Sequence, residues 1–232
     1  MKRYKDVFGD QKTFFPVVHV VDEIQAFRNV DIAFANGADG IFLIQHDHNT
    51  QLLLEAYFYV RESFLTQWIG LNFLGLTLRQ TLNRFPESAS GIWWDNAYVR
   101  EDMLSTSRSH IYFEFKDLFP QALVFGGIAF KYQPEVEFKD LAKVARNARL
   151  VTDVATTSGE KTGKAADIEK IKTIRHGLYN HPMAVASGIT VENVRDFLPL
   201  VDSFLVATGV SDSFTELNPQ RVRELAETIH SI

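Results

Sequence analysis

Small and hydroxyl-bearing residues gather in three short segments of the second half of the chain. These candidate phosphate-binding residues are Ser158, Gly159, Thr162, Gly163, Ser187, Gly188, Thr208 and Gly209. Glycine lets the backbone come close to an anion, hydroxyl groups donate hydrogen bonds, and free N–H groups at a following helix start point at the anion's oxygens. Any one segment is also typical of a simple strand-to-helix turn. The three together indicate a phosphate site.

Four polar residues near the ends of apolar runs are candidates for catalysis: Asp153, Lys131, Asp95 and Asn72. Asp153 lies within the apolar run 150–155, where an ionised group must be paired. We expect Lys131 to pair with it across the end of the sheet. Asp153 would then transfer a proton while Lys131 stabilises negative charge, and a structural ion pair is the alternative.

Asp95 follows Trp93 and Trp94, and aromatic surroundings raise the pKa of a carboxyl group toward values that suit proton transfer. The alternative is that Asp95 begins a loop or caps a helix. Either tryptophan could stack on a ring of the ligand, although packing in the core is the commoner fate of a buried tryptophan.

His46 and His48 flank Asp47, a spacing that would place both imidazoles on one side of an extended segment. With Asp22 or His19 nearby, they would suit a metal-dependent hydrolase. Such residues are also ordinary in loops and helix caps, so the prediction is that no metal and no cofactor are held. His19 falls in the middle of a predicted strand and is interpreted as an interior histidine with its hydrogen bonds satisfied.

Apolar runs that alternate with helix-period segments must position these residues. The predicted strands cover residues 16–22, 40–45, 68–73, 91–95, 122–129, 150–155, 183–186 and 203–207. A helical segment follows each strand, including one between residues 101 and 118. The alternation is typical of βα units and a parallel sheet.

Eight such units predict a (β/α)8 TIM barrel, formed as one domain over residues 1–232. An open doubly wound sheet is the competing fold, but its glycine-rich loop follows the first strand. Here the first predicted strand ends in Asp22, and glycines gather after the sixth, seventh and eighth strands. Barrels of this type hold phosphate at the carboxyl ends of their last strands.

Composition narrows the class of protein. The chain has 232 residues, 46% of them hydrophobic, which is enough for a large core, and no cysteine for disulfides or a thiolate nucleophile. A net charge of -5 argues against nucleic acid as a partner. No apolar run is long enough for a membrane span and no signal peptide is evident, so the cytoplasm is the expected location. The unusually apolar helical segment 52–64 suggests a subunit interface and a homo-oligomer.

Particular motifs of the second half match a known group. They are Thr162-Gly163, the run Ala186-Ser187-Gly188-Ile189-Thr190 with Asn193, and Val206-Ala207-Thr208. In these the chain resembles the BtpA/SgcQ family of TIM-barrel proteins, and Asn72 and Lys131 match two further strand-end elements more weakly. Tyr132 stands where the family has His, and QHDHNTQL replaces its Glu-Asn element after the second strand. The resemblance therefore implies a divergent member with a different substrate.

The family itself implies little chemistry, and one member is associated with assembly or stability of photosystem I. Our main hypothesis is an enzyme that binds a phosphorylated small molecule, such as a phosphosugar or nucleotide. The reaction would be that of an isomerase, a lyase, or a transferase acting on phosphoribosyl or glycosyl bonds. The last strands are also similar to those of phosphoribosylanthranilate isomerase. That resemblance would imply catalysis by a Cys and an Asp, but this chain lacks cysteine, so an isomerase of that mechanism is disfavoured. The alternative is a non-catalytic assembly factor.

Overall fold

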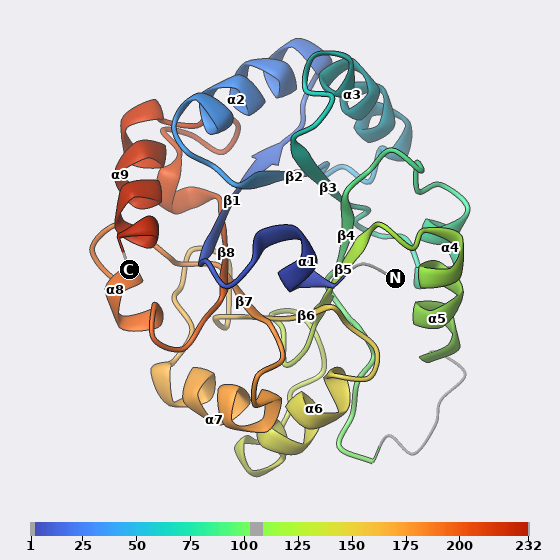
Figure 1. Ribbon diagram of the computed structural model, residues 1–232, viewed down its shortest axis with the longest axis vertical. Helices are drawn as coiled ribbons and strands as arrows, with labels where there is room; N and C mark the ends of the chain where they lie inside the picture. The colour runs from blue at the N-terminus through green and yellow to red at the C-terminus, as the bar shows by residue number, and fades with distance from the viewer. Residues whose placement is uncertain (1–2, 103–108, 232) are drawn as a thin grey trace.

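Eight parallel strands close into a barrel in the computed structural model, which describes residues 3–102 and 109–231. Each strand pairs with the next, and β8 pairs with β1 to complete the ring (Figure 1). The strands are β1 (Thr13–His19), β2 (Gly40–Ile44), β3 (Trp68–Asn72), β4 (Gly91–Trp94), β5 (Leu123–Gly127), β6 (Val154–Ser158), β7 (Met183–Ala186) and β8 (Ser203–Val206). The predicted (β/α)8 TIM barrel is confirmed.

Helices surround the barrel as an outer ring (Figure 1). They are α2 (Glu23–Ala35), α3 (Thr50–Ser63), α4 (Leu78–Leu82), α5 (Ser109–Leu118), α6 (Leu141–Ala148), α7 (Ile168–Leu178), α8 (Val194–Phe197) and α9 (Pro219–His230), with short 3-10 turns η1 (Phe138–Asp140) and η2 (Thr208–Val210). Side chains cap the starts of several helices. Asn49, Thr77 and Asn218 each accept a backbone N–H, at the starts of α3, α4 and α9. Of the segment expected to be helical between 101 and 118, residues 103–108 lie outside the described residues. Within the described chain, no helix has both the length and the hydropathy to cross a membrane.

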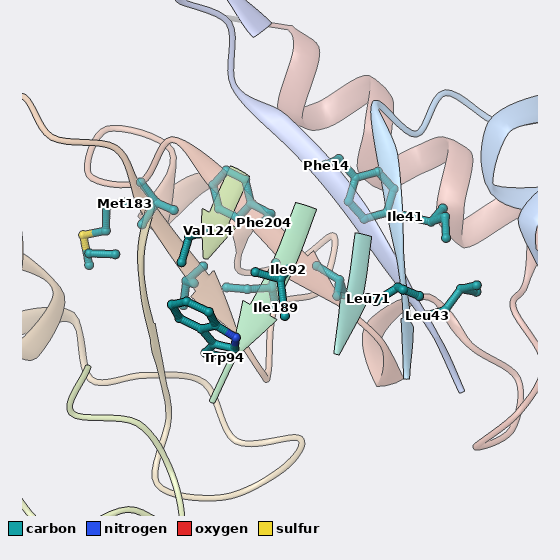
Figure 2. Close-up of a cluster of buried hydrophobic side chains, with 14 of the residues drawn as sticks. Phe14, Ile41, Leu43, Leu71, Ile92, Trp94, Val124, Met183, Ile189 and Phe204 are labelled. Carbon is teal, nitrogen blue, oxygen red and sulfur yellow. The ribbon is translucent and has the colours of Figure 1, made fainter. Parts of the chain in front are cut away.

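Two layers of apolar side chains hold the barrel together. Alternate residues of each strand point outward against the helices, as Figure 2 shows for Phe14, Leu43, Trp94 and Phe204. The intervening residues fill the barrel itself, where the Phe42 and Phe125 rings meet edge to face with centroids 5.1 Å apart. This alternation decides which polar residues at the strand ends face the barrel axis.

A short helix that the sequence interpretation missed, α1 (Tyr4–Phe8), covers the amino-terminal end of the barrel (Figure 1). Phe8 packs its ring 5.5 Å from Phe15 and 5.9 Å from Trp68, both interior residues. The Tyr4 hydroxyl lies 2.7 Å from the Thr13 hydroxyl at the start of β1. The end of the barrel opposite the strands' carboxyl ends is therefore closed by the chain's own first helix.

Two strand boundaries differ from those expected. β1 begins and ends three residues early, which makes His19 its last residue, and β6 begins four residues late. The run from Thr156 to Ser158 looks like a polar loop in the sequence, yet it pairs with β7 and is fully buried. Hydroxyls fit there partly because Thr157 donates to the Ala129 carbonyl and Ser158 to the Gly159 carbonyl. The shift of β6 moves Asp153 to the other end of that strand.

Candidate active site

An amide and a carboxylate meet at the carboxyl ends of β3 and β4, at the open end of the barrel that we call the mouth. Asn72 ends β3, and Asp95 follows β4 at the next inward position of the alternation. The Asn72 side-chain N–H donates to Asp95 Oδ1 over 2.9 Å. Burial raises the pKa of Asp95, while the Asn72 hydrogen bond and the charge of Lys131 lower it by less. Asp95 is thus a carboxyl group that holds its proton more strongly than usual.

Lys131, which follows β5, reaches across the mouth to the loops after β6 and β7. Its ammonium donates to the Thr162 and Ser187 hydroxyls, each over 3.1 Å. Its backbone N–H donates to the buried Ser158 hydroxyl over 2.8 Å. Burial lowers the pKa of the Lys131 amine, and Asp95 partly opposes this. In the described part of the chain Lys131 has no carboxylate within ion-pair distance, so its charge is available to a ligand.

The three glycine-containing loops converge. Gly188 has φ +68° and lies so close to the loop after β6 that a Cβ atom would come within 2.0 Å of the Ala165 nitrogen. A Cβ on Gly209 would come within 1.9 Å of the Ile189 carbonyl oxygen, which joins the loops after β7 and β8. Gly163, with φ +78°, faces open space beside the Thr208 hydroxyl. Among the described residues, the N–H groups of Gly163 and Gly188 have no backbone acceptor.

Asn193 explains one of the family-like motifs. Its side-chain oxygen accepts the Thr190 N–H over 2.9 Å, and its side-chain N–H donates to the Gly188 carbonyl over 2.7 Å. The Gly188 carbonyl is therefore turned inside the loop. By contrast, Ser158 is completely buried, so Ser158 and Gly159 contribute to the internal structure of the loop after β6. The loop hydroxyls that contact Lys131 at the mouth are those of Thr162 and Ser187.

The predicted pair between Asp153 and Lys131 is wrong. Asp153 lies just before β6, at the amino-terminal end of the barrel, where its side chain accepts from Lys116 Nζ and from the Val124 N–H, each over 2.8 Å. The Tyr112 hydroxyl completes its surroundings at 3.1 Å. Lys116 and Asp153 expose only 1% and 8% of their side chains. Asp153 is thus a member of a buried structural ion pair remote from the strands' carboxyl ends.

Two histidines lie at the mouth, of which the sequence interpretation treated His46 as a candidate metal ligand and His19 as an interior residue. His19 ends β1 and His46 follows β2, and their ring centroids are 4.6 Å apart. Phe214, from the loop between β8 and α9, packs 4.1 Å from the His19 ring and 4.9 Å from the His46 ring. His19 becomes visible as a mouth residue only once the end of β1 is known, because inward-facing residues recur every second position.

Electrostatic coupling joins these groups into one site. Burial lowers the pKa of His19 to about 4, with smaller contributions from His46 and Lys131. Burial and the Lys131 charge also lower the pKa of His46. The Lys131 ammonium therefore acts on His19, His46 and Asp95 alike.

The metal hypothesis gains no support from the side-chain arrangement. His46 packs against His19 and Phe214, whereas His48 turns away to lie against Gly75 in the loop after β3. Across residues 3–102 and 109–231, no group of three or more His, Asp or Glu side chains is arranged to hold a metal ion.

Comparison with solved structures finds the same fold in phosphate-related enzymes. (S)-3-O-geranylgeranylglyceryl phosphate synthase from Thermoplasma acidophilum, in complex with its substrate sn-glycerol-1-phosphate, is similar with a TM-score of 0.72 at 12% identity, over 100% of both chains. Phosphoribosyl anthranilate isomerase from Thermus thermophilus is similar with a TM-score of 0.65 at 13% identity, over 94% of this chain and 98% of that one. The corresponding isomerase from Pyrococcus furiosus gives a TM-score of 0.64 at 13% identity, over 95% and 100%. Identities this low show the fold alone.

Comparison of the sequence with curated proteins finds no significant match. The family model described as the BtpA family, however, matches residues 101–231, more than half of the chain. That stretch contains Lys131 and all three glycine-containing loops. The family expectation drawn from the sequence is confirmed, and this chain belongs to the BtpA family.

Proposed function

We propose that this protein is an enzyme that binds a phosphorylated small molecule across the mouth of the barrel. The phosphate would rest on the loops after β6, β7 and β8, through Thr162, Gly163, Gly188 and their neighbours. The observation that supports this most is the Lys131 ammonium, which is held by hydroxyls of two of these loops and has no carboxylate partner among the described residues. A cation with only neutral hydrogen-bond partners, held by loops in which the Gly163 and Gly188 N–H groups have no backbone acceptor among the described residues, is arranged to receive an anion.

The chemistry would take place beside the phosphate, at Asp95, Asn72 and Lys131. Asp95 has a raised pKa and Lys131 a lowered one, so each is closer to the range in which a group can exchange a proton at neutral pH. Asn72 orients the carboxyl group through its hydrogen bond. Isomerisation, aldol-type cleavage and phosphoribosyl or glycosyl transfer all need proton transfer close to a phosphate and suit this arrangement. Asp153 has no part in it, because it lies at the opposite end of β6.

The solved neighbours support the proposal by analogy. One of them holds sn-glycerol-1-phosphate as substrate on the same fold. Barrels of this type repeatedly place phosphate at the loops after the last two strands, beside a short extra helix, and η2 follows β8 here. Analogy of fold raises the expectation of a phosphate ligand but does not identify the substrate.

Calorimetric titration with inorganic phosphate and with glycerol phosphate tests the proposal. Replacing Lys131 by Gln should weaken binding of both by about tenfold to a hundredfold, because charge-assisted hydrogen bonds contribute about 1.5–3 kcal/mol. Lys139→Gln is the matched control, since it removes the same charge from a side chain that is 74% exposed and pairs with Glu137. Equal affinity in the two variants, or no binding by the unaltered protein, would refute the proposed site.

A homo-oligomer is a second proposal, supported by apolar side chains that are exposed around α3. Phe58 exposes 51%, Leu65 73% and Ile24, from the neighbouring α2, 68%. Single exposed apolar residues are ordinary, but a group of them on adjacent elements suits a contact with another chain. Light scattering should give a mass above 26.4 kDa that Leu65→Asp lowers. A monomer at all concentrations would contradict this.

A further inference from the structure

His19 makes one defined hydrogen bond at the mouth. Its Nδ1 lies 2.7 Å from the Phe214 carbonyl oxygen, while its ring stacks against the Phe214 ring. A carbonyl oxygen can only accept, so Nδ1 must carry the hydrogen. The second ring nitrogen, Nε2, has no hydrogen-bond partner within the described residues. A neutral imidazole with this arrangement has its lone pair on Nε2.

We propose that His19 presents an unprotonated Nε2 at the mouth as the acceptor for a hydroxyl group of the phosphorylated ligand, and that the Phe214 carbonyl fixes this tautomer. The inference deepens the proposed function and rests on it. It adds a substrate class, namely a phosphate ester that carries a hydroxyl group close to the phosphate, as phosphorylated polyols and sugars do.

The loop segment that carries the Phe214 carbonyl is held in place by buried amides of α2, which bind the next residue, Thr215. Gln25 Nε2 donates both to the His19 carbonyl, over 3.1 Å, and to the Thr215 carbonyl, over 2.5 Å. Asn29, which is completely buried, donates to Thr215 and accepts the Leu217 N–H over 2.6 Å. The loop after β8 is therefore fastened to the helix that follows β1. Gln25 and Asn29 act as positioning residues for His19.

The charges around His19 keep its ring neutral without a ligand. His19 is 8% exposed, and His46 after β2 and Lys131 after β5 both disfavour a positive charge on its ring. A bound phosphate would offset Lys131 and favour proton uptake by His19. His19 would thus become a better base when the ligand binds, which suits acceptance of a hydroxyl proton.

Histidine-selective nitrogen NMR measures the tautomer directly in the unaltered protein. We expect His19, assigned by the resonance missing in His19→Gln, to show protonated Nδ1 and unprotonated Nε2 from pH 6 to pH 8. Phe214→Ala keeps the carbonyl and should keep the tautomer, whereas Gln25→Ala frees the loop and should produce a mixture. A protonated Nε2 in the unaltered protein would overturn the inference.

The ligand part is tested with two probes, inorganic phosphate and glycerol phosphate. Both should shift the backbone amides of Gly163 and Gly188, but only glycerol phosphate should shift His19 Nε2 strongly. His19→Ala should weaken glycerol phosphate about tenfold, the effect of one hydrogen bond of about 1.4 kcal/mol, and leave inorganic phosphate unchanged. Amide shifts with an unresponsive Nε2 would refute this inference alone. No shift at Gly163 or Gly188 with either probe would refute the proposed phosphate site.

Discussion

Asp153 and Asp95 lie at opposite ends of the barrel, and burial has a different consequence for each of them. Asp153, at the amino-terminal end, accepts from Lys116, Tyr112 and the Val124 N–H, so its charge is fully compensated. Asp95, at the mouth, has one amide donor and a more distant ammonium, and burial raises its pKa. The first arrangement pairs the carboxylate with a buried ammonium, and the second leaves a carboxyl group whose raised pKa brings it closer to exchanging a proton. Incomplete compensation distinguishes the candidate site from a structural ion pair.

The largest effect on stability is expected at the amino-terminal end of the barrel, where the charge of Asp153 is compensated. Asp153→Asn removes the charge partner of Lys116, which is 1% exposed, and should lower the free energy of unfolding by about 3–5 kcal/mol. Urea denaturation measures this, and phosphate titration at a temperature where the variant is folded serves as the control. Unchanged stability with a loss of phosphate affinity would mean that Asp153 belongs to the site after all.

A smaller effect is expected from crowding the mouth. Gly209→Ala places a methyl group against the Ile189 carbonyl and should cost about 1–3 kcal/mol of stability together with phosphate affinity. Gly177→Ala is the matched control, because its methyl group would meet the Ala142 carbonyl between α6 and α7, outside the mouth. Loss of phosphate affinity in both variants would show a general loss of structure instead of a local one.

His19 at the mouth and His181 at the amino-terminal end of the barrel should each make stability depend on pH, to a similar extent. The pKa values of His19 and His181 are both lowered to about 4, chiefly by burial, with added repulsion from Arg149 and Arg175 at His181. The unfolded chain binds protons that the folded chain does not between about pH 4 and 6.5, so stability falls as pH falls through that window.

Each such histidine contributes up to about 1.4 kcal/mol per pH unit to this slope. Thermal or urea unfolding from pH 7 to pH 4.5 should therefore show a shallower dependence in His19→Gln and, separately, in His181→Gln. A slope that neither variant alters would contradict the assignment of neutral imidazoles to these two positions.

The smallest expected effect is Asp95→Asn, the same change as at Asp153 but at the other end. Because the folded pKa is raised, stability falls as pH rises from the unfolded pKa toward the folded one, and the amide removes this fall. At pH 7 the variant should be as stable as the parent or more stable by up to about 1 kcal/mol, with the Asn72 hydrogen bond retained. Destabilisation comparable to that of Asp153→Asn would end the distinction between the two aspartates.

Most of the fold was predictable from the chain, and part of the candidate site was. The strands β2, β3, β4 and β7 begin where their apolar runs begin, and the three loops lie at the mouth. Asn72, Asp95 and Lys131 were predicted as site residues and lie together. Asp153 was misplaced because Leu150 and Val151 extend the apolar run in sequence, although they form the turn after α6. His19 was interpreted as an interior residue because β1 ends three residues earlier than its apolar run suggests, whereas His46 was considered as a metal ligand.

The sequence by itself determined the eight βα units. Each strand and helix must bury one regularly repeating set of apolar side chains, and the spacing of these residues can be read from the sequence. It also determined where glycine permits positive φ, as at Gly163 and Gly188. Tertiary structure alone decided the ends of the strands, since hydrogen bonds from neighbouring strands fix the register. A shift of four residues at the start of β6 carried Asp153 to the opposite end of the barrel, and a shift of three residues in β1 brought His19 to the mouth, because contacts between distant segments have no counterpart in local sequence.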